Sequence, residues 1–208
     1  MITANFVKKA LMAATGATVV TFVGGQAAEA VTFNFAGLDL APSLNFSQGG
    51  INVTATGAAT NGSRLVSQVP VGLGVFGGLG DSLQTDGLGA DETLQLAFNK
   101  QIRLISASFS RVGFNDDFRL LVDGDELVSA DIPGGNILDL GTGTFDFTSF
   151  ALPDRTGSVL GFTVAGDNDD YFLSAIEVEP VPEPLTILGS LSALGMGAAL
   201  KKKQQKKS

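Results

Sequence analysis

The sequence predicts an all-β domain built as an antiparallel β-sandwich of the jelly-roll kind. Apolar and polar residues alternate in short runs between residues 31 and 179, which is the period of half-buried strands. No window in this stretch repeats its apolar residues with the 3.6-residue period of a helix. Glycine and Asn-Gly or Asp-Gly pairs interrupt the runs about every ten residues, which is typical of sandwiches and jelly rolls.

The strands expected from this alternation are residues 31–35, 51–56, 93–98, 102–112, 118–122, 125–128, 144–150, 158–164 and 171–179. The run at 102–112 is predicted to be one long strand with a bulge, and Asp123-Gly124 to be the tight turn of a hairpin. The phenylalanines, including Phe145 and Phe147, are expected to fill the core. Residues 70–92 are too glycine-rich for a core strand and are expected to form a long irregular loop.

Residues 1–30 have the order of parts of a secretory signal peptide. Lys8 and Lys9 precede an apolar region at residues 10–25, and Ala28 and Ala30 supply the small-x-small site for cleavage before Val31. The expected partners of this segment are Sec-type export machinery and signal peptidase. The alternative is a permanent N-terminal anchor, which the short apolar region and the well-placed cleavage site disfavour.

The C-terminal segment, residues 180–208, has three parts: Pro182-Glu183-Pro184, the uncharged residues 185–200 and a tail at 201–208 with five lysines. As a helix the uncharged part spans about 24 Å, slightly less than a hydrocarbon core of about 30 Å. Snorkelling lysine side chains make up the difference and hold the tail on the cytoplasmic side. This segment is therefore predicted to be a single transmembrane helix, with an ordinary tail anchor as the alternative.

The order of these three parts resembles that of PEP-CTERM sorting-domain proteins, which occur in Gram-negative bacteria that make exopolysaccharide. The motif matches at Pro182, Glu183 and Pro184, the helix at residues 185–200 and the basic end at residues 201–208. The resemblance covers about the last thirty residues of the chain. It implies transient insertion into the inner membrane, cleavage by an exosortase, and transfer to the cell surface, outer envelope or extracellular matrix.

The remaining residues, 31–179, are one domain by length and are strongly acidic. They contain six basic and nineteen acidic residues, a net formal charge of −13 against −8 for the whole chain. Such a surface repels nucleic acid and anionic lipid, and it suits divalent cations or a soluble matrix component. The chain has no cysteine, so disulfide bonds cannot stabilise the exported domain.

The lack of histidine and cysteine excludes most catalytic sites. Ser-His-Asp and Cys-His nucleophiles and zinc sites built on imidazole or thiolate all need one of these residues. Two carboxylates about 5–9 Å apart could hydrolyse a glycoside, but nineteen acids make some pairing inevitable. The sequence therefore predicts that the protein is not an enzyme and leaves a carboxylate glycosidase as the weakest alternative.

Calcium is the metal that the acid clusters would suit, because it prefers carboxylate and carbonyl oxygens on loops. Each cluster adjoins the end of an expected strand, and none fits an EF-hand loop. The candidate ligands are Asp86, Asp91, Glu92, Asp116, Asp117, Asp167, Asp169 and Asp170. The alternative is that these are solvated turn residues that also protect sheet edges from aggregation.

Taken together, the sequence predicts an exported structural or adhesive protein of the cell envelope or matrix, associated with exopolysaccharide. The alternative in the same non-enzymatic class is a calcium-dependent carbohydrate-binding module of jelly-roll form. Such a module should show an exposed row of aromatic rings or a polar groove, and the chain has no tryptophan and a single tyrosine, Tyr171, which counts against it.

Overall fold

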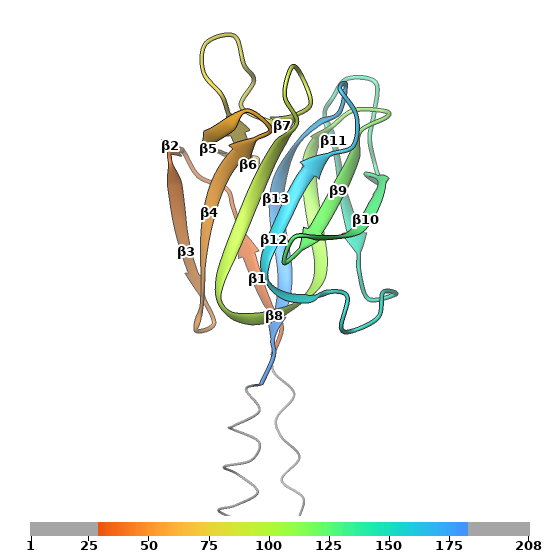
Figure 1. The fold of residues 1–208 in the computed structure, drawn as a ribbon. Coiled ribbons are helices and arrows are strands. Elements are labelled where there is room, and N and C mark those ends of the chain that lie inside the picture. The colour runs from red at the N-terminus through yellow and green to blue at the C-terminus, as the bar shows by residue number, and fades with distance from the viewer. Residues whose placement is uncertain (1–28, 183–208) are drawn as a thin grey trace, which may run out of the picture.

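The computed structural model describes residues 29–182, and every regular element there is a β-strand (Figure 1). The strands are β1 Val31–Asn34, β2 Asp39–Ala41, β3 Ser43–Gln48, β4 Ile51–Ala59, β5 Gly62–Val69, β6 Gly72–Phe76, β7 Thr85–Asp86, β8 Glu92–Val112, β9 Asp117–Val122, β10 Asp125–Asp131, β11 Gly141–Asp146, β12 Thr156–Val164 and β13 Asp170–Pro180. All strand pairs are antiparallel. The predicted all-β antiparallel class is confirmed. Residues 29–182 contain no helix of the length and hydropathy needed to cross a membrane.

Strand β8 links two layers of strands because it is 21 residues long and bends back at its middle (Figure 1). Its first half lies in the order β3-β4-β8-β12-β9-β10, and its second half lies between β13 and β11. Beyond β13 follow β6, β5 and β2, while β1 and β7 also pair with β13. The sequence predicted two strands at 93–98 and 102–112, whereas the structure joins them.

The bend of β8 is held by Arg155, which precedes β12. The Leu104 N–H donates to the Arg155 carbonyl at 3.0 Å, and the Arg155 Nη1 donates to the Leu104 carbonyl at 2.7 Å. The Arg155 side chain is buried, so these contacts supply polar partners where the ladder changes neighbours.

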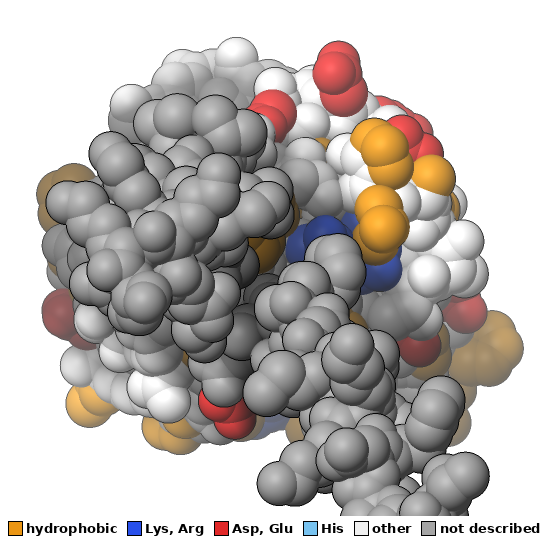
Figure 2. Space-filling model, turned by 90° about the horizontal axis from the view of Figure 1, so that it is seen from below, with side chains coloured by type: hydrophobic (Ala, Val, Ile, Leu, Met, Phe, Trp, Pro, Cys, Tyr) orange, Lys and Arg blue, Asp and Glu red, His pale blue; other side chains and the backbone are white. Residues whose placement is uncertain are grey.

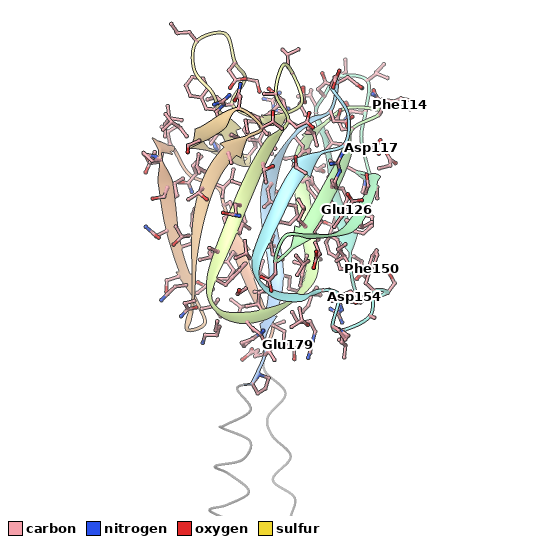
Figure 3. The ribbon with its side chains drawn as sticks, in the orientation of Figure 1. Phe114, Asp117, Glu126, Phe150, Asp154 and Glu179 are labelled. Carbon is pink, nitrogen blue, oxygen red and sulfur yellow. The ribbon has the colours of Figure 1, made fainter. Side chains whose placement is uncertain are left out.

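Both described ends of the chain leave the domain at the same pole (Figure 1). Val31 pairs with Val178 in an antiparallel register, which places the start of β1 beside the end of β13. We call this end the basal pole and the opposite end the distal pole. Figure 3 shows Glu179 at the basal pole, and Phe114 and Asp117 towards the distal one.

The core between the layers is rich in phenylalanine, as predicted. The Phe109 ring lies 5.0 Å from that of Phe118 and 5.2 Å from that of Tyr171, with an edge-to-face arrangement in the second pair. Phe147 is fully buried, and Phe145 packs against the core from a partly buried position. Phe114 is the exception, since 74% of it is exposed in the loop between β8 and β9.

The prediction of an irregular loop at residues 70–92 is wrong for the part that forms β6 and β7. Leu73 and Val75 of β6 are fully buried. Gly72 and Gly74 of this strand allow other backbone segments to approach closely: a Cβ on Gly74 would clash with the Leu83 carbonyl oxygen. Strands β2, β3 and β5 were also missing from the sequence prediction.

The predicted hairpin at Asp123-Gly124 is confirmed. The turn joins β9 to β10, and its two residues have φ values of 51° and 98°. Two successive residues with positive φ are the requirement of a type I′ turn, which Asp-Gly meets at low cost.

Most of both predicted sorting segments lie outside the described residues, including Ala28, Glu183, Pro184, the predicted helix at 185–200 and the tail at 201–208. Of the residues assigned to them, Ala30 and Pro182 are exposed, and Val31 begins β1.

Candidate functional site

The acids predicted to form a metal site come together at the distal pole from different parts of the chain. Asp86 of β7 pairs in register with Asp170, the first residue of β13. Glu92 begins β8, and Asp117 begins β9 directly after Asp116. Asp169 lies in the loop between β12 and β13.

Four of these acids are buried, and each accepts hydrogen bonds from its own neighbourhood. Asp86 accepts from the Ser82 hydroxyl at 2.7 Å and from the Leu88 N–H at 3.1 Å. Asp169 accepts from the Gly166 N–H at 2.6 Å. The further bonds of this kind run from the Asp86 N–H to Glu92 and from the Gly113 N–H to Asp116. The carboxylates therefore close the distal loops, in the manner of Asx turns.

These acids share one pole but do not converge on one point. Within residues 29–182, no three of them are placed so that they could hold a single metal ion. Asp91 and Asp167 are exposed at the outside of their loops, away from the buried acids. The geometry therefore gives the four buried acids a structural role in holding the distal loops, and calcium binding stays a prediction.

Burial raises the pKa of several distal carboxyl groups. The pKa of Glu92 rises from 4.5 to about 8, mainly because this side chain is only 3% exposed. The Arg64 Nε lies 4.0 Å from the Glu92 Oε1, and its positive charge lowers the pKa of Glu92 by less than desolvation raises it. The Arg64 guanidinium also donates hydrogen bonds to the Asn61 side chain and to the Ser63 carbonyl. Burial likewise raises the pKa of Asp116 to about 6.

The same cause raises the pKa of Asp117 and of Asp170, and the charge of Asp169 adds to it in both cases. The distal acids thus repel one another electrostatically as well as being desolvated. Protonation of some of these carboxyl groups therefore lowers the electrostatic repulsion at the distal pole.

A neutral Glu92 beside Asp86 is the kind of carboxyl pair that glycosidases use as acid and base. Here the two side chains are 3% and 5% exposed. A sugar substrate therefore has no access to this pair.

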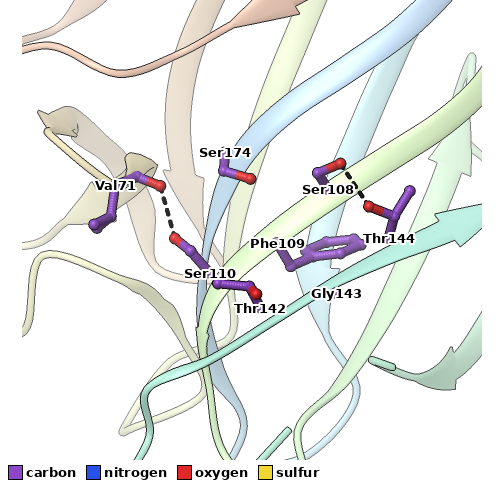
Figure 4. A pocket seen from close by; sticks show the side chains of 8 residues that line it. All are labelled: Val71, Ser108, Phe109, Ser110, Thr142, Gly143, Thr144 and Ser174. Atoms are coloured by element: carbon purple, nitrogen blue, oxygen red, sulfur yellow. Dashed lines mark hydrogen bonds between the residues drawn. The ribbon is translucent and has the colours of Figure 1, made fainter. Parts of the chain in front are cut away.

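A second candidate site is an open groove of about 450 Å³ on the outer face of the sheet formed by β8, β11 and β13 (Figure 4). Hydroxyl groups dominate its lining, and Ser108 and Thr144 are hydrogen-bonded to each other at 2.9 Å. The Ser110 hydroxyl donates to the Val71 carbonyl at 2.6 Å. Ser174 and Thr142 complete the set of hydroxyl side chains. None of the described residues that line the groove is a carboxylate, so these residues present uncharged hydrogen-bonding groups to a ligand.

A third hollow, of about 420 Å³, lies beside the β9–β10 hairpin and contains acids that the sequence analysis did not select. Asp125, Glu126 and Asp154 line it around Phe150, and Figure 3 labels three of these residues. The fourth acid, Asp123, accepts from the N–H groups of Ser158 and Val159 at 2.9 and 2.8 Å. Asp123 therefore secures the hairpin to β12.

Comparison of the chain with protein-family models, with curated proteins and with solved structures found no match. The function is accordingly argued from the residues and their arrangement.

Proposed function

We propose that this chain is an exported structural or adhesive component of the cell envelope or extracellular matrix, associated with exopolysaccharide. Its N-terminal segment is a signal peptide, and its C-terminal segment is a PEP-CTERM-type sorting signal cleaved by an exosortase. The observation that carries the proposal is the position of the two described ends, which leave the domain side by side at the basal pole. A domain with this arrangement can stand on a membrane by one pole and leave the rest of its surface free.

The distribution of charge supports this orientation. Three of the domain's six basic residues, Lys100, Arg103 and Arg155, lie at or beside the basal bend of β8. Figure 2 views the basal pole, where basic side chains are visible near the middle and acidic ones towards the rim. The distal acids point away from this end. At the basal pole Arg103 is paired with Glu179 and Arg155 is buried, so an anionic membrane acts mainly by repelling the distal acids.

The outer surface of the layer β3-β4-β8-β12-β9-β10 supports the proposal that the domain lies in a hydrated matrix. Strands β3 and β4 contain no charged residue, and neither does β8 between Glu92 and Lys100. Asn45 and Thr54 are hydrogen-bonded to each other on this surface. Amide and hydroxyl groups exchange hydrogen bonds with neutral polysaccharide and water without attracting counterions.

The groove of Figure 4 favours a second candidate, a carbohydrate-binding module of jelly-roll form. Its hydroxyl lining suits the hydroxyl groups of a sugar chain. Against this candidate, Tyr171 is fully buried and donates to the Thr163 carbonyl at 3.0 Å, so the single tyrosine offers no stacking platform. A pull-down on exopolysaccharide, with and without a chelator, tests this candidate and its calcium dependence.

The proposed sorting is tested by substituting both prolines of the motif, Pro182→Ala and Pro184→Ala, in the full chain in the producing bacterium. We expect the wild-type chain to yield a shortened product at the cell surface and the double variant to remain in the membrane fraction at full length. Pro153→Ala, in an exposed loop of the domain, is the matched control. Equal processing of all three chains would contradict the proposal.

A further inference from the structure

The groove of Figure 4 is lined by a regular set of hydroxyl groups from three neighbouring strands. In the antiparallel register of β8 and β11, Ser110 lies opposite Thr142, and Ser108 lies opposite Thr144. Opposite residues of such a pair lie about 5 Å apart, and residues two apart along one strand lie about 7 Å apart. The four side chains therefore form a compact two-by-two array, to which Ser174 of β13 adds a fifth hydroxyl group.

Two β-bulges border this array. The register of β13 with β8 changes between Leu173 and Ala175, so Ser174 is an extra residue of β13. This bulge lets both Leu173 and Ile176 point into the core, and between them Ser174 lines the groove. The other bulge, at the distal end of the pairing of β8 with β11, has Arg111 as its extra residue, with a φ of 56°. Bulges are over-represented beside functional sites because they redirect side chains.

The hydroxyl groups of the groove offer both donors and acceptors to a ligand. Ser108 and Thr144 are hydrogen-bonded to each other at 2.9 Å, so one of the two still has a proton to donate, and both oxygens can accept. A ligand can reach these groups, because Thr142 and Thr144 are exposed and Ser174 is partly exposed. Donors and acceptors in one array complement a ligand that itself carries hydroxyl groups.

The charges in and around the groove favour an uncharged ligand. The described residues that line it include no acid and no base, so they supply neither a counter-ion for an anion nor a carboxylate for a metal ion. In the next row along the same strands, Ser106 lies opposite Asp146 of β11 and Glu177 of β13. These carboxylates, in a domain with a net charge of −13, repel acidic polysaccharides. They can still accept hydrogen bonds from the hydroxyl groups of a neutral sugar.

We propose that this groove binds an uncharged stretch of polysaccharide, without a metal ion, through its accessible hydroxyl groups. These groups belong to Ser108, Thr142, Thr144 and Ser174. The one aromatic residue in the described lining, Phe109, is only 1% exposed and offers no ring for stacking. A single domain therefore binds weakly, and firm attachment needs several domains on one polysaccharide chain. The inference rests on the proposed function, because it assigns the association with exopolysaccharide to this groove.

The test measures binding of the full chain, purified in detergent, to the exopolysaccharide of the producing bacterium. An anion exchanger first separates this material into an unretained neutral fraction and a retained acidic fraction. The groove variant carries Thr142→Val and Thr144→Val, which remove two exposed hydroxyl groups and keep β-branched side chains on the strand. The matched control carries Thr54→Val and Thr56→Val, at two partly exposed positions of β4.

Melting temperatures show whether the variants are folded. A second groove variant, Ser174→Ala, covers the case in which the double substitution does not fold. We expect the wild type to bind the neutral fraction in the presence of a chelator, and the control to bind equally well. The double groove variant should bind at least tenfold more weakly, and Ser174→Ala severalfold more weakly.

Equal binding of the groove variants and the wild type would overturn this inference and leave the proposed association with exopolysaccharide standing. Equal weakening of the control, tighter binding to the acidic fraction, or loss of binding in the chelator would also overturn it. If the wild type binds neither fraction, the inference and the association both fail. Export and sorting are decided separately, by the ends of the mature chain.

Discussion

The main-chain N–H of Val181 donates to the carbonyl of Gln101 at 3.0 Å, immediately before the first proline of the Pro182-Glu183-Pro184 motif. Strand β13 is paired up to this point, since Pro180 lies opposite Ile102 on β8. The folded domain therefore continues to the residue before the motif, with no spacer between them. An enzyme that cleaves at this motif must therefore bind a segment that directly adjoins the basal pole of the folded domain.

This arrangement predicts that processing is limited by unpairing of the end of β13. Insertion of Gly-Ser-Gly-Ser between Pro180 and Val181 should speed up cleavage severalfold, because each backbone hydrogen bond that must open costs about 1 kcal/mol. A pulse-chase experiment on the full chain measures the rate. The same insertion after Gly89, in a distal loop, is the control. Equal rates for the two insertions would show that the basal pairing does not restrict the enzyme.

The raised pKa of Glu92 predicts that the protein loses stability as the pH rises. Between pH 4.5 and about 8 the folded protein keeps a proton on Glu92 that the unfolded chain has released. Unfolding becomes easier by on the order of 5 kcal/mol across this window. The raised pKa of Asp116, about 6, acts in the same direction. Melting temperatures at pH 5 and pH 8 measure the effect.

Glu92→Gln should flatten this pH dependence, because glutamine accepts the hydrogen bond from Asp86 without ionising. The neighbouring exposed residue supplies the control, Asp91→Asn. A Glu92→Gln protein whose stability falls with pH as steeply as that of the wild type would show that another group controls the transition.

Gly74→Ala should destabilise the domain by about 3 kcal/mol, because the new methyl group meets a backbone carbonyl that has no room to move. Gly161→Ala is the matched control in β12: its Cβ would lie 3.3 Å from the end of the Leu121 side chain, which can rotate away. Urea unfolding of both variants gives the free energies. Similar small losses in both would show that β6 is not packed as closely as described.

Calcium binding at the distal pole predicts a rise in melting temperature of about 5 °C or more in millimolar calcium. The geometry predicts no such rise, because the buried carboxylates already accept bonds from loop N–H groups. The measurement compares the chelator-treated protein with and without calcium. A rise that Asp169→Asn or Asp170→Asn abolishes would instead establish the calcium hypothesis.

The strands that carry a clear alternation of apolar and polar residues could be predicted from the sequence, as β4, β9 and the first part of β8 illustrate. The Asp-Gly turn after β9 was also predictable, because its requirement for positive φ is local. Strand β6 was not, since its glycines indicate a loop when considered alone. Their role appears only in the folded structure, where the backbone at Leu83 approaches Gly74 and the backbone at Leu173 approaches Gly72.

The candidate sites were less predictable than the fold. The sequence selected clusters of acids near strand ends, and the fold does gather many of them at one pole. It could not reveal that Asp86, Glu92, Asp116 and Asp169 are buried, because burial depends on how the loops fold over them. The hydroxyl groove was not predicted, although Ser106, Ser108 and Ser110 alternate along β8. Its other lining residues come from β11 and β13, which are distant from β8 in the sequence.

Mass spectrometry of the protein recovered from the cell surface or matrix tests the central claim most directly, because it determines both ends of the mature chain. The account predicts that the chain begins at Val31 and ends at or near Pro182-Glu183-Pro184, without the lysine-rich tail. Recovery of the intact chain, from Met1 to Ser208, in the soluble cytosol would contradict it.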